Sequence, residues 1–217
     1  MLHHIQRLIA EGEHQQLDFK FEVSDTHKIA RSLVAFANTD GGRLLIGIRD
    51  DGSISGIRTE EEFFMLETAA RTHCKPVVEY FHKEWIIRKK TILEVVVKRS
   101  QNRPHFAVSK EGKWIAYIRV KDQNFAVNRI LLRVWEKEHK MQGAFLKYTD
   151  DEKRLLTYLE NNRTISLSKF VRICKISRNK AENILVNFLL LKILEIHFSE
   201  NTIYYSLNPN ADLKENL

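Results

Sequence analysis

The stretch from Glu13 to Gly56 constrains the fold more than any other part of the chain, because it joins an alternating strand, an amphipathic helix and a glycine turn in one short unit. Residues 17–21 alternate apolar and charged side chains, which suits a strand with one buried face. Ser24 and Asp25 offer N-cap oxygens, and apolar residues then recur at helical spacing. Asn-Thr-Asp-Gly-Gly at 38–42 ends this helix, since glycine accepts the positive φ of a tight exit.

The sequence after this turn predicts a β-hairpin and then a mixture of helices and strands. Residues 43–49 form an apolar strand, Asp50-Asp51-Gly52 is a turn signal, and residues 53–57 return antiparallel to that strand. We then expect a helix at 60–73, strands at 77–82, 85–88, 92–98 and 114–120, and a closing helix at 125–140. Because the element order is mixed rather than alternating, we predict an α+β fold with a mixed or largely antiparallel sheet and flanking helices.

Past residue 143 the pattern changes to three helices and a hairpin. The helices open at Asp150, Ser166 and Ser177, and residues 195–207 form two strands around a polar turn. Three helices and a hairpin in about sixty residues predict a small winged helix-turn-helix domain. The predicted organisation is a first domain at 1–142, a linker at 143–149, a winged helix at 150–208 and a tail at 209–217.

Positive charge gathers in this second domain. The chain carries a net charge of +7, which favours an anionic partner, and residues 163–180 hold six cations and no acid. In a helix-turn-helix these positions face the duplex. We predict groove contacts from Arg178, Asn179 and Lys180, and phosphate contacts from Arg163, Lys169, Arg172 and Lys175. The structural alternative is a solvated basic face, or a domain that mediates protein contacts.

The residues of the first domain resemble the Schlafen AlbA-like family. The resemblance rests on residues 13–20, on the turn and strand at 38–48, and on the following hairpin. Residues 103–106 and 117–120 look like the proline loop and the Tyr-x-Arg strand of that family. The resemblance implies a domain that is labelled DNA-binding, with Arg119 as a candidate phosphate contact. The alternative role of Arg119 is a pair with a carboxylate such as Asp18 across the sheet.

Some Schlafen proteins are ribonucleases whose acidic trio lies in this motif. Carried over residue by residue, the trio is Glu13, Asp18 and Asp40, with Asp18 where the family often has glutamate. If the chain is a nuclease, the resemblance implies that these carboxylates bind Mg²⁺ or Mn²⁺, which activates water and neutralises the phosphoryl transition state. The structural alternative is that Glu13 and Asp18 are solvated or ion-paired and that Asp40 makes an Asx-type bond in its turn.

Composition limits the other possibilities. At 43% hydrophobic and 29% charged residues, the chain should be globular. No apolar run approaches the roughly 20 residues of a membrane span, and the first residues are too short and polar for a signal peptide, so we expect a cytoplasmic protein without a membrane partner. Cys74 and Cys174 are isolated, which predicts neither a disulfide framework nor a cysteine zinc site. The sequence has no Walker-type loop, so we expect no nucleotide cofactor.

Two functions from different classes follow from the sequence. The favoured one is a DNA-binding transcriptional regulator, whose winged helix recognises the duplex. The alternative is a metal-dependent ribonuclease, which needs its three carboxylates to converge within about 5 Å of one metal position. DNA is the expected partner and RNA the alternative. The apolar run at 188–194 has more apolar side chains than the core of a small isolated domain requires. We therefore expect it to pack on the first domain or on a second subunit of a homo-oligomer.

Overall fold

The computed structural model describes residues 4–57, 61–140, 149–200 and 202–211. The chain divides into two compact units, Met1–Val127 and Asn128–Leu217. Each unit has a hydrophobic core of its own. Within the described residues, no helix is both long enough and apolar enough to cross a membrane.

The first unit combines three helices with two sheets. The helices are α1 (His4–Glu11), α2 (Thr26–Asn38) and α3 (Glu61–Arg71). The strands are β1 (Leu17–Lys20), β2 (Gly42–Ile46), β3 (Cys74–Lys75), β4 (Tyr80–Ile87), β5 (Lys90–Val97), β6 (Phe106–Val108), β7 (Trp114–Val120) and β8 (Gln123–Ala126). The sheet orders are β1-β2-β5-β4 and β3-β6-β7-β8, with β1 and β2 parallel and the other pairs antiparallel. The predicted α+β class with a mixed sheet and flanking helices is confirmed.

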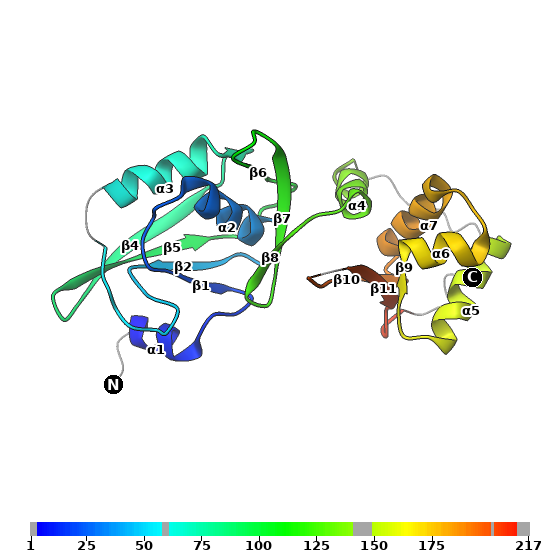
Figure 1. Cartoon of the computed structure of the whole chain (residues 1–217), viewed down its shortest axis with the longest axis horizontal. Coiled ribbons are helices and arrows are strands. Elements are labelled where there is room, and N and C mark those ends of the chain that lie inside the picture. Colours follow the sequence, from blue (N-terminus) through cyan, green and yellow to red (C-terminus); the bar gives the residue numbers. More distant parts are fainter. Residues whose placement is uncertain (1–3, 58–60, 141–148, 201, 212–217) are drawn as a thin grey trace. The chain divides into compact units, whose positions relative to one another are not determined.

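Helix α2 forms the centre of the first unit, because it packs against both sheets (Figure 1). Asp25 caps its N-terminus by accepting hydrogen bonds from the backbone of His27 and Lys28. Its apolar side chains share a core with α3 and with strands β2 and β5. Helix α1 covers the opposite face of the β1-β2-β5-β4 sheet, where Ile5 and Leu8 pack on Leu17, Phe19 and Leu45.

The turn at 38–42 joins α2 to β2 and to the second sheet. Asn38 is buried, and its amide donates to the carbonyl oxygens of His105 and Tyr117, each at 2.9 Å. The Asn38 side-chain oxygen accepts from the His105 backbone at 2.8 Å. Gly41 has a φ of +73° and donates its N–H to the Phe36 carbonyl at 2.9 Å. This motif therefore fixes the end of α2 between the two sheets.

Two strand predictions in the first unit were wrong. The predicted strands 77–82 and 85–88 are one continuous strand, β4, because its eight residues all pair with β5. The predicted return strand at 53–57 is reduced to a single bridge between Ile48 and Ile54. The Asp50–Gly52 turn is present, but Ser55 and Gly56 both donate to the Gly47 carbonyl instead of continuing a ladder.

The second unit contains four described helices and a small antiparallel sheet. The helices are α4 (Arg129–His139), α5 (Asp150–Asn161), α6 (Leu167–Cys174) and α7 (Arg178–Leu190). The strands are β9 (Ile165–Ser166), β10 (Leu194–Phe198) and β11 (Ile203–Leu207), in the order β10-β11-β9. Ser166 and Ser177 cap α6 and α7 as predicted. Thr149 caps α5 in a capping box with Glu152, so the cap lies one residue before the predicted acidic run.

Helix α4 belongs to the second unit, although the sequence placed it at the end of the first domain. Ile130 and Val134 are buried in the core of the second unit. Asn128 caps α4 and donates its amide to the Tyr205 hydroxyl at 3.1 Å. The first unit therefore ends at Val127 rather than at residue 142. The predicted linker lies outside the described residues apart from Thr149, and residues 209–211 are the described part of the predicted tail.

Candidate nucleic-acid interface

Glu13 and Asp18 form a hydrogen-bonded carboxyl pair at the start of β1. Glu13 Oε1 also accepts from the Phe19 backbone at 2.8 Å. Burial and the hydrogen bond to Asp18 raise the pKa of Glu13 to about 7. Burial alone would raise the pKa of Asp18, but the hydrogen bond from Glu13 and the charges of Lys20 and Arg119 lower it overall. The pair therefore holds a proton on Glu13 up to neutral pH, while Asp18 stays ionised.

The Asp18 carboxylate is almost fully enclosed by protein partners. Its side chain is 5% exposed, and Oδ1 lies 3.0 Å from Lys20 Nζ and 3.5 Å from Arg119 Nη2. Ser32 Oγ donates to Oδ2 at 3.1 Å. Asp18 is thus a buried ion-paired residue, which is the structural alternative that the sequence left open.

Asp40 does not join this pair. It is exposed, and its carboxylate accepts from Gln15 Nε2 at 3.4 Å. Within the described ranges, no group of three or more His, Cys, Asp or Glu side chains is placed to hold a metal ion. Lys20 and Arg119 already supply positive charge to Asp18, so a divalent cation there would meet two cations. Glu13, Asp18 and Asp40 do not fit the Mg²⁺ or Mn²⁺ site that the nuclease alternative needs.

Arg119, the candidate phosphate contact, is buried, and its guanidinium lies beside Asp18, as in the alternative role expected from the sequence. The side chain is 1% exposed. Its Nε donates to the His14 carbonyl at 3.1 Å, Nη2 to the Leu17 carbonyl at 3.0 Å, and Nη1 to Asn124 Oδ1 at 3.3 Å. Together with Asp18, these acceptors give each of the three guanidinium nitrogen atoms a partner within the protein. Arg119 therefore holds β7 against the segment that leads into β1.

The raised pKa of Glu13 predicts how stability changes with pH. Because the pKa of Glu13 lies near 7 in the folded protein and near 4.5 when unfolded, its stabilising contribution is full below pH 4.5 and is lost as the pH rises through 7. In Glu13→Gln the amide can donate to Asp18 and accept from Phe19 at every pH. Allowing for solvent screening of this partly exposed group, we expect the variant to gain about 1 kcal/mol over the parent between pH 5 and pH 8.

Urea unfolding of both proteins at pH 5 and pH 8 measures this gain. Burial also lowers the pKa of His73 and of His105, so these groups make the protein more stable as the pH rises. Their contribution is the same in both proteins, and the difference between the two proteins therefore isolates Glu13. An identical pH dependence in the parent and in Glu13→Gln would show that the carboxyl pair holds no shifted proton.

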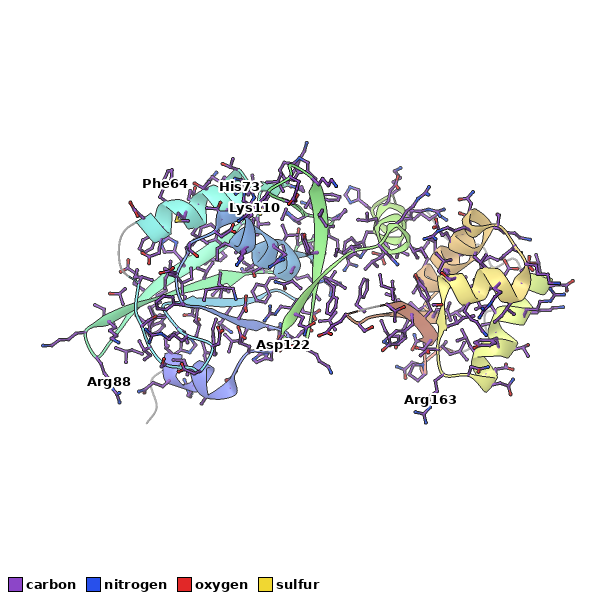
Figure 2. The ribbon with its side chains drawn as sticks, viewed as in Figure 1. Phe64, His73, Arg88, Lys110, Asp122 and Arg163 are labelled. Carbon is purple, nitrogen blue, oxygen red and sulfur yellow. The ribbon has the colours of Figure 1, made fainter. Side chains whose placement is uncertain are left out.

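The predicted cations of the second unit lie on α6, α7 and the segments beside them. Arg163, after α5, extends into solvent (Figure 2). Arg172 on α6 and Lys175 at its C-cap are exposed. These three cations have no hydrogen-bond or ion-pair partner among the residues that the structure describes. Lys169 is half-buried, with its Nζ 5.9 Å from the centre of the Tyr158 ring.

Two of the three predicted groove residues are paired within the protein. Arg178 Nε lies 3.1 Å from Glu182 Oε1, one helical turn along α7. Lys180 Nζ lies 2.5 Å from Asp151 Oδ2 on α5. The Arg178 and Lys180 side chains are nevertheless 73% and 54% exposed. Asn179, between them, is exposed at the start of α7. Surface pairs of this kind contribute about 0–1 kcal/mol, so both cations can exchange partners.

Glu182 organises this surface, although it was not predicted as a site residue from the sequence. Its side chain is 6% exposed, and its Oε2 lies 3.8 Å from Arg129 and 4.0 Å from Arg133, both on α4. This acid therefore joins α4 to α7 while it pairs with Arg178. The spacing of Arg178 and Glu182 is readable in the sequence as an i,i+4 pair, but the arginines of α4 are not local.

Comparison with known families identifies the first unit. A family model described as Schlafen, AlbA_2 matches residues 13–128, which is more than half of the chain. The chain belongs to this family. The family resemblance expected from the sequence is thus confirmed, and it associates this Schlafen AlbA_2 protein with nucleic-acid binding. No curated protein matches the chain.

Two solved structures are similar to parts of this Schlafen AlbA_2 protein. One is the DIP2311 protein from Corynebacterium diphtheriae, with a TM-score of 0.44 and 21% identity, and the match covers 65% of this chain and 28% of that one. The other is the N-terminal domain of a protein from Nitrosomonas europaea that is named as related to the ATP-dependent DNA helicase RecG. Its TM-score is 0.38 at 21% identity, and the match covers 59% of this chain and 97% of that domain.

Proposed function

We propose that this protein is a DNA-binding transcriptional regulator whose second unit is a winged helix that contacts duplex DNA. The observation that carries the proposal is the surface of α6 and α7, where Arg172 and Lys175 are exposed without an acidic partner in the described residues. Free cations on one surface can replace the counterions of DNA phosphates, and this exchange supplies most of the affinity of non-specific binding.

The order of the elements supports the winged-helix interpretation. Helix α6 and helix α7 are separated by a short turn in which Lys175 takes the left-handed conformation. The β10-β11 hairpin follows α7 directly. In a helix-turn-helix, the first residues of the second helix reach base edges in the major groove. Arg178, Asn179 and Lys180 occupy that part of α7.

The chemistry of these residues suggests how the duplex would be read. The amide of Asn179 can pair with adenine in the major groove, since asparagine offers both a donor and an acceptor. Phosphate would compete with Glu182 for Arg178 and with Asp151 for Lys180. In the β10-β11 turn, Ser199, Glu200 and Thr202 carry no positive charge. We therefore assign the phosphate contacts to α6, α7 and Arg163 rather than to this turn.

The alternative ribonuclease function gains no support from the arrangement of Glu13, Asp18 and Asp40.

A homo-oligomer stays a prediction from the sequence. Leu189, Leu190 and Leu191, from the apolar run that motivated it, are partly buried against the core of the second unit. A two-fold dimer would be the expected form of a regulator that binds paired half-sites.

Fluorescence anisotropy of a labelled mixed-sequence duplex, titrated in EDTA over a salt series, tests this function. If about three phosphates are contacted, the logarithm of affinity should fall against the logarithm of salt concentration with a slope near −2.7. In the variant Arg172→Gln/Lys175→Asn we expect this slope to become shallower by about 1.8, so the affinity at about 0.15 M salt should fall about 30-fold. Asparagine is chosen at 175 because it tolerates the left-handed backbone found there.

The matched control is Arg154→Gln/Lys192→Asn. It removes the same charge from exposed positions of the second unit, and Lys192 shares the left-handed backbone of Lys175, with φ values of +55° and +53°. We expect the control to bind nearly as the parent does. An equal loss of duplex affinity in both variants would show that only the net charge matters. If the parent did not bind the duplex, the duplex function would be refuted and structured RNA would be tested next.

A further inference from the structure

A cavity of about 410 Å³ lies in the first unit beside the end of the β4-β5 hairpin. Its apolar walls come from Ile9 of α1, Ile54 and Ile87. Arg88 and Lys90 bring positive charge to it from the hairpin. This volume falls within the range of sites that enclose small ligands, and an apolar interior with a few polar groups is their usual composition.

The charge around this cavity is positive. Among the described residues that line it, none carries a carboxylate. Arg88 has no ion pair or hydrogen bond within the described ranges, whereas Lys90 Nζ donates to the Ile54 carbonyl at 2.7 Å. The nearby Asp51 carboxylate is engaged in its own turn, where it accepts from the Ser53 backbone at 2.8 Å. An anionic group at the cavity would therefore meet Arg88 without displacing an acid.

The backbone of the hairpin turn is an independent observation. Ile87 pairs with Lys90, so Arg88 and Lys89 alone form the loop, with φ values of +50° and +62°. A two-residue loop with positive φ at both positions is a type I′ turn, which strongly favours Asn-Gly. Arginine and lysine are strained in this conformation, and such strain is typical of functional sites. Figures 1 and 2 show the hairpin reaching out past α2 and α3, with Arg88 at its outer end.

We infer that this cavity and turn bind a nucleotide, with the base between the isoleucine side chains and the phosphate on Arg88 and Lys89. An unstacked base fits an apolar pocket, as it does in proteins that extract bases from a strand. The guanidinium of Arg88 can hold a phosphate through two hydrogen bonds. The nucleotide can be free or part of a single strand. The site lies in the first unit and does not depend on the duplex contact proposed for the second.

The test uses the intact chain and three variants. In Arg88→Asn/Lys89→Gly the turn takes its preferred residues and loses both cations. In Ser53→Trp a large side chain enters at a residue that lines the cavity, while the cations stay. The control Lys98→Asn/Arg99→Gln removes the same charge from exposed residues just beyond the other end of β5. A labelled unstructured 15-nucleotide single strand is titrated in EDTA, with AMP and UMP as competitors, and the melting temperature of every variant is measured.

We expect Arg88→Asn/Lys89→Gly to bind the strand at least tenfold more weakly, although its melting temperature equals or exceeds that of the parent. Ser53→Trp should also weaken binding, and the control should change it less than twofold. Displacement of the strand by AMP or UMP identifies a free mononucleotide as ligand, and its absence identifies a nucleotide within a strand. Every protein is also titrated with the duplex, so that failure of this site and failure of the duplex function are distinguished.

Parent-like strand binding by Arg88→Asn/Lys89→Gly would overturn the inference, because the strained cations would then contact no nucleotide. Ile86, next to the turn, is 75% exposed, so the hairpin also has the composition of a membrane-surface contact. Sedimentation with vesicles of phosphatidylcholine and phosphatidylserine tests that outcome. The nucleotide site would be refuted in favour of a membrane surface by two results together. The parent would bind neither the strand nor the mononucleotides, and it would bind vesicles in a way that is lost in Arg88→Asn/Lys89→Gly.

Discussion

Arg119→Met is expected to lower the free energy of unfolding by about 3–5 kcal/mol, because it removes one partner of a buried ion pair and leaves the other charged. The guanidinium makes three hydrogen bonds, to the carbonyls of His14 and Leu17 and to Asn124, and lies 3.5 Å from Asp18. Methionine fills a similar volume but supplies no donor, so Asn124 Oδ1 and Asp18 each lose a charged donor, while the His14 and Leu17 carbonyls keep only the backbone N–H groups that they accept from each other. Urea unfolding at pH 7 measures the loss.

The matched control for Arg119→Met is Lys20→Met. Lys20 also pairs with Asp18, at 3.0 Å, but its side chain is 32% exposed, so water can replace the ammonium group. We expect this control to cost about 1 kcal/mol or less. If instead Arg119→Met left the free energy of unfolding within 1 kcal/mol of the parent and weakened nucleic-acid binding, Arg119 would be a ligand contact rather than a structural residue.

Arg119 also illustrates what a single sequence leaves undetermined in this fold. Alternation along 114–120 predicts which side chains share a face of β7, and that strand is found with the predicted bounds. Alternation does not say what covers each face. Helix α2 packs against β7, and His14 before β1 and Leu17 at its start supply carbonyl acceptors for Arg119. The sequence left open whether Arg119 contacts phosphate or pairs with Asp18, and its burial depends on parts of the chain about 100 residues away.

The helices of the second unit were easier to predict, because their ends depend on local chemistry. Ser166 and Ser177 each accept a hydrogen bond from the backbone three residues ahead, and α6 and α7 begin directly after them. The assignment of α4 failed for the opposite reason. Its apolar residues predict a helix, but only tertiary contacts with α7 and β11 decide which core it joins.

The candidate site divides in the same way. The cation run at 163–180 is visible from spacing alone, and the pairing of Arg178 with Glu182 follows from helical periodicity. The pairing of Lys180 with Asp151 joins residues on different helices and has no local signal. Arg88, Lys89 and Lys90 are consecutive in the sequence, where Arg88 was predicted to end a strand, but the left-handed backbone of Arg88 and Lys89 and the neighbouring cavity appear only in three dimensions.

Gly41→Ala is the second substitution for which we expect a large effect, a loss of about 3–4 kcal/mol in the free energy of unfolding. Gly41 has a φ of +73°, and a Cβ there would lie 2.7 Å from the Val97 carbonyl oxygen and 2.9 Å from the Arg99 backbone nitrogen. Both contacts are with backbone atoms, so β5 and the residues after it would have to move. The left-handed conformation adds about 1–2 kcal/mol for an alanine.

Gly12→Ala separates these two causes, because Gly12 has the same φ of +73° and a Cβ there would meet no atom within 4 Å. We expect that control to cost about 1 kcal/mol, from backbone conformation alone. The remaining 2–3 kcal/mol in Gly41→Ala would then measure how closely the 38–42 turn packs on the end of β5. Equal losses in the two variants, measured by urea unfolding, would show that the turn adapts freely. An excess at Gly41 would mean that the glycines of this family motif serve the packing of α2 and β2, whatever ligand the neighbouring Asp40 contacts.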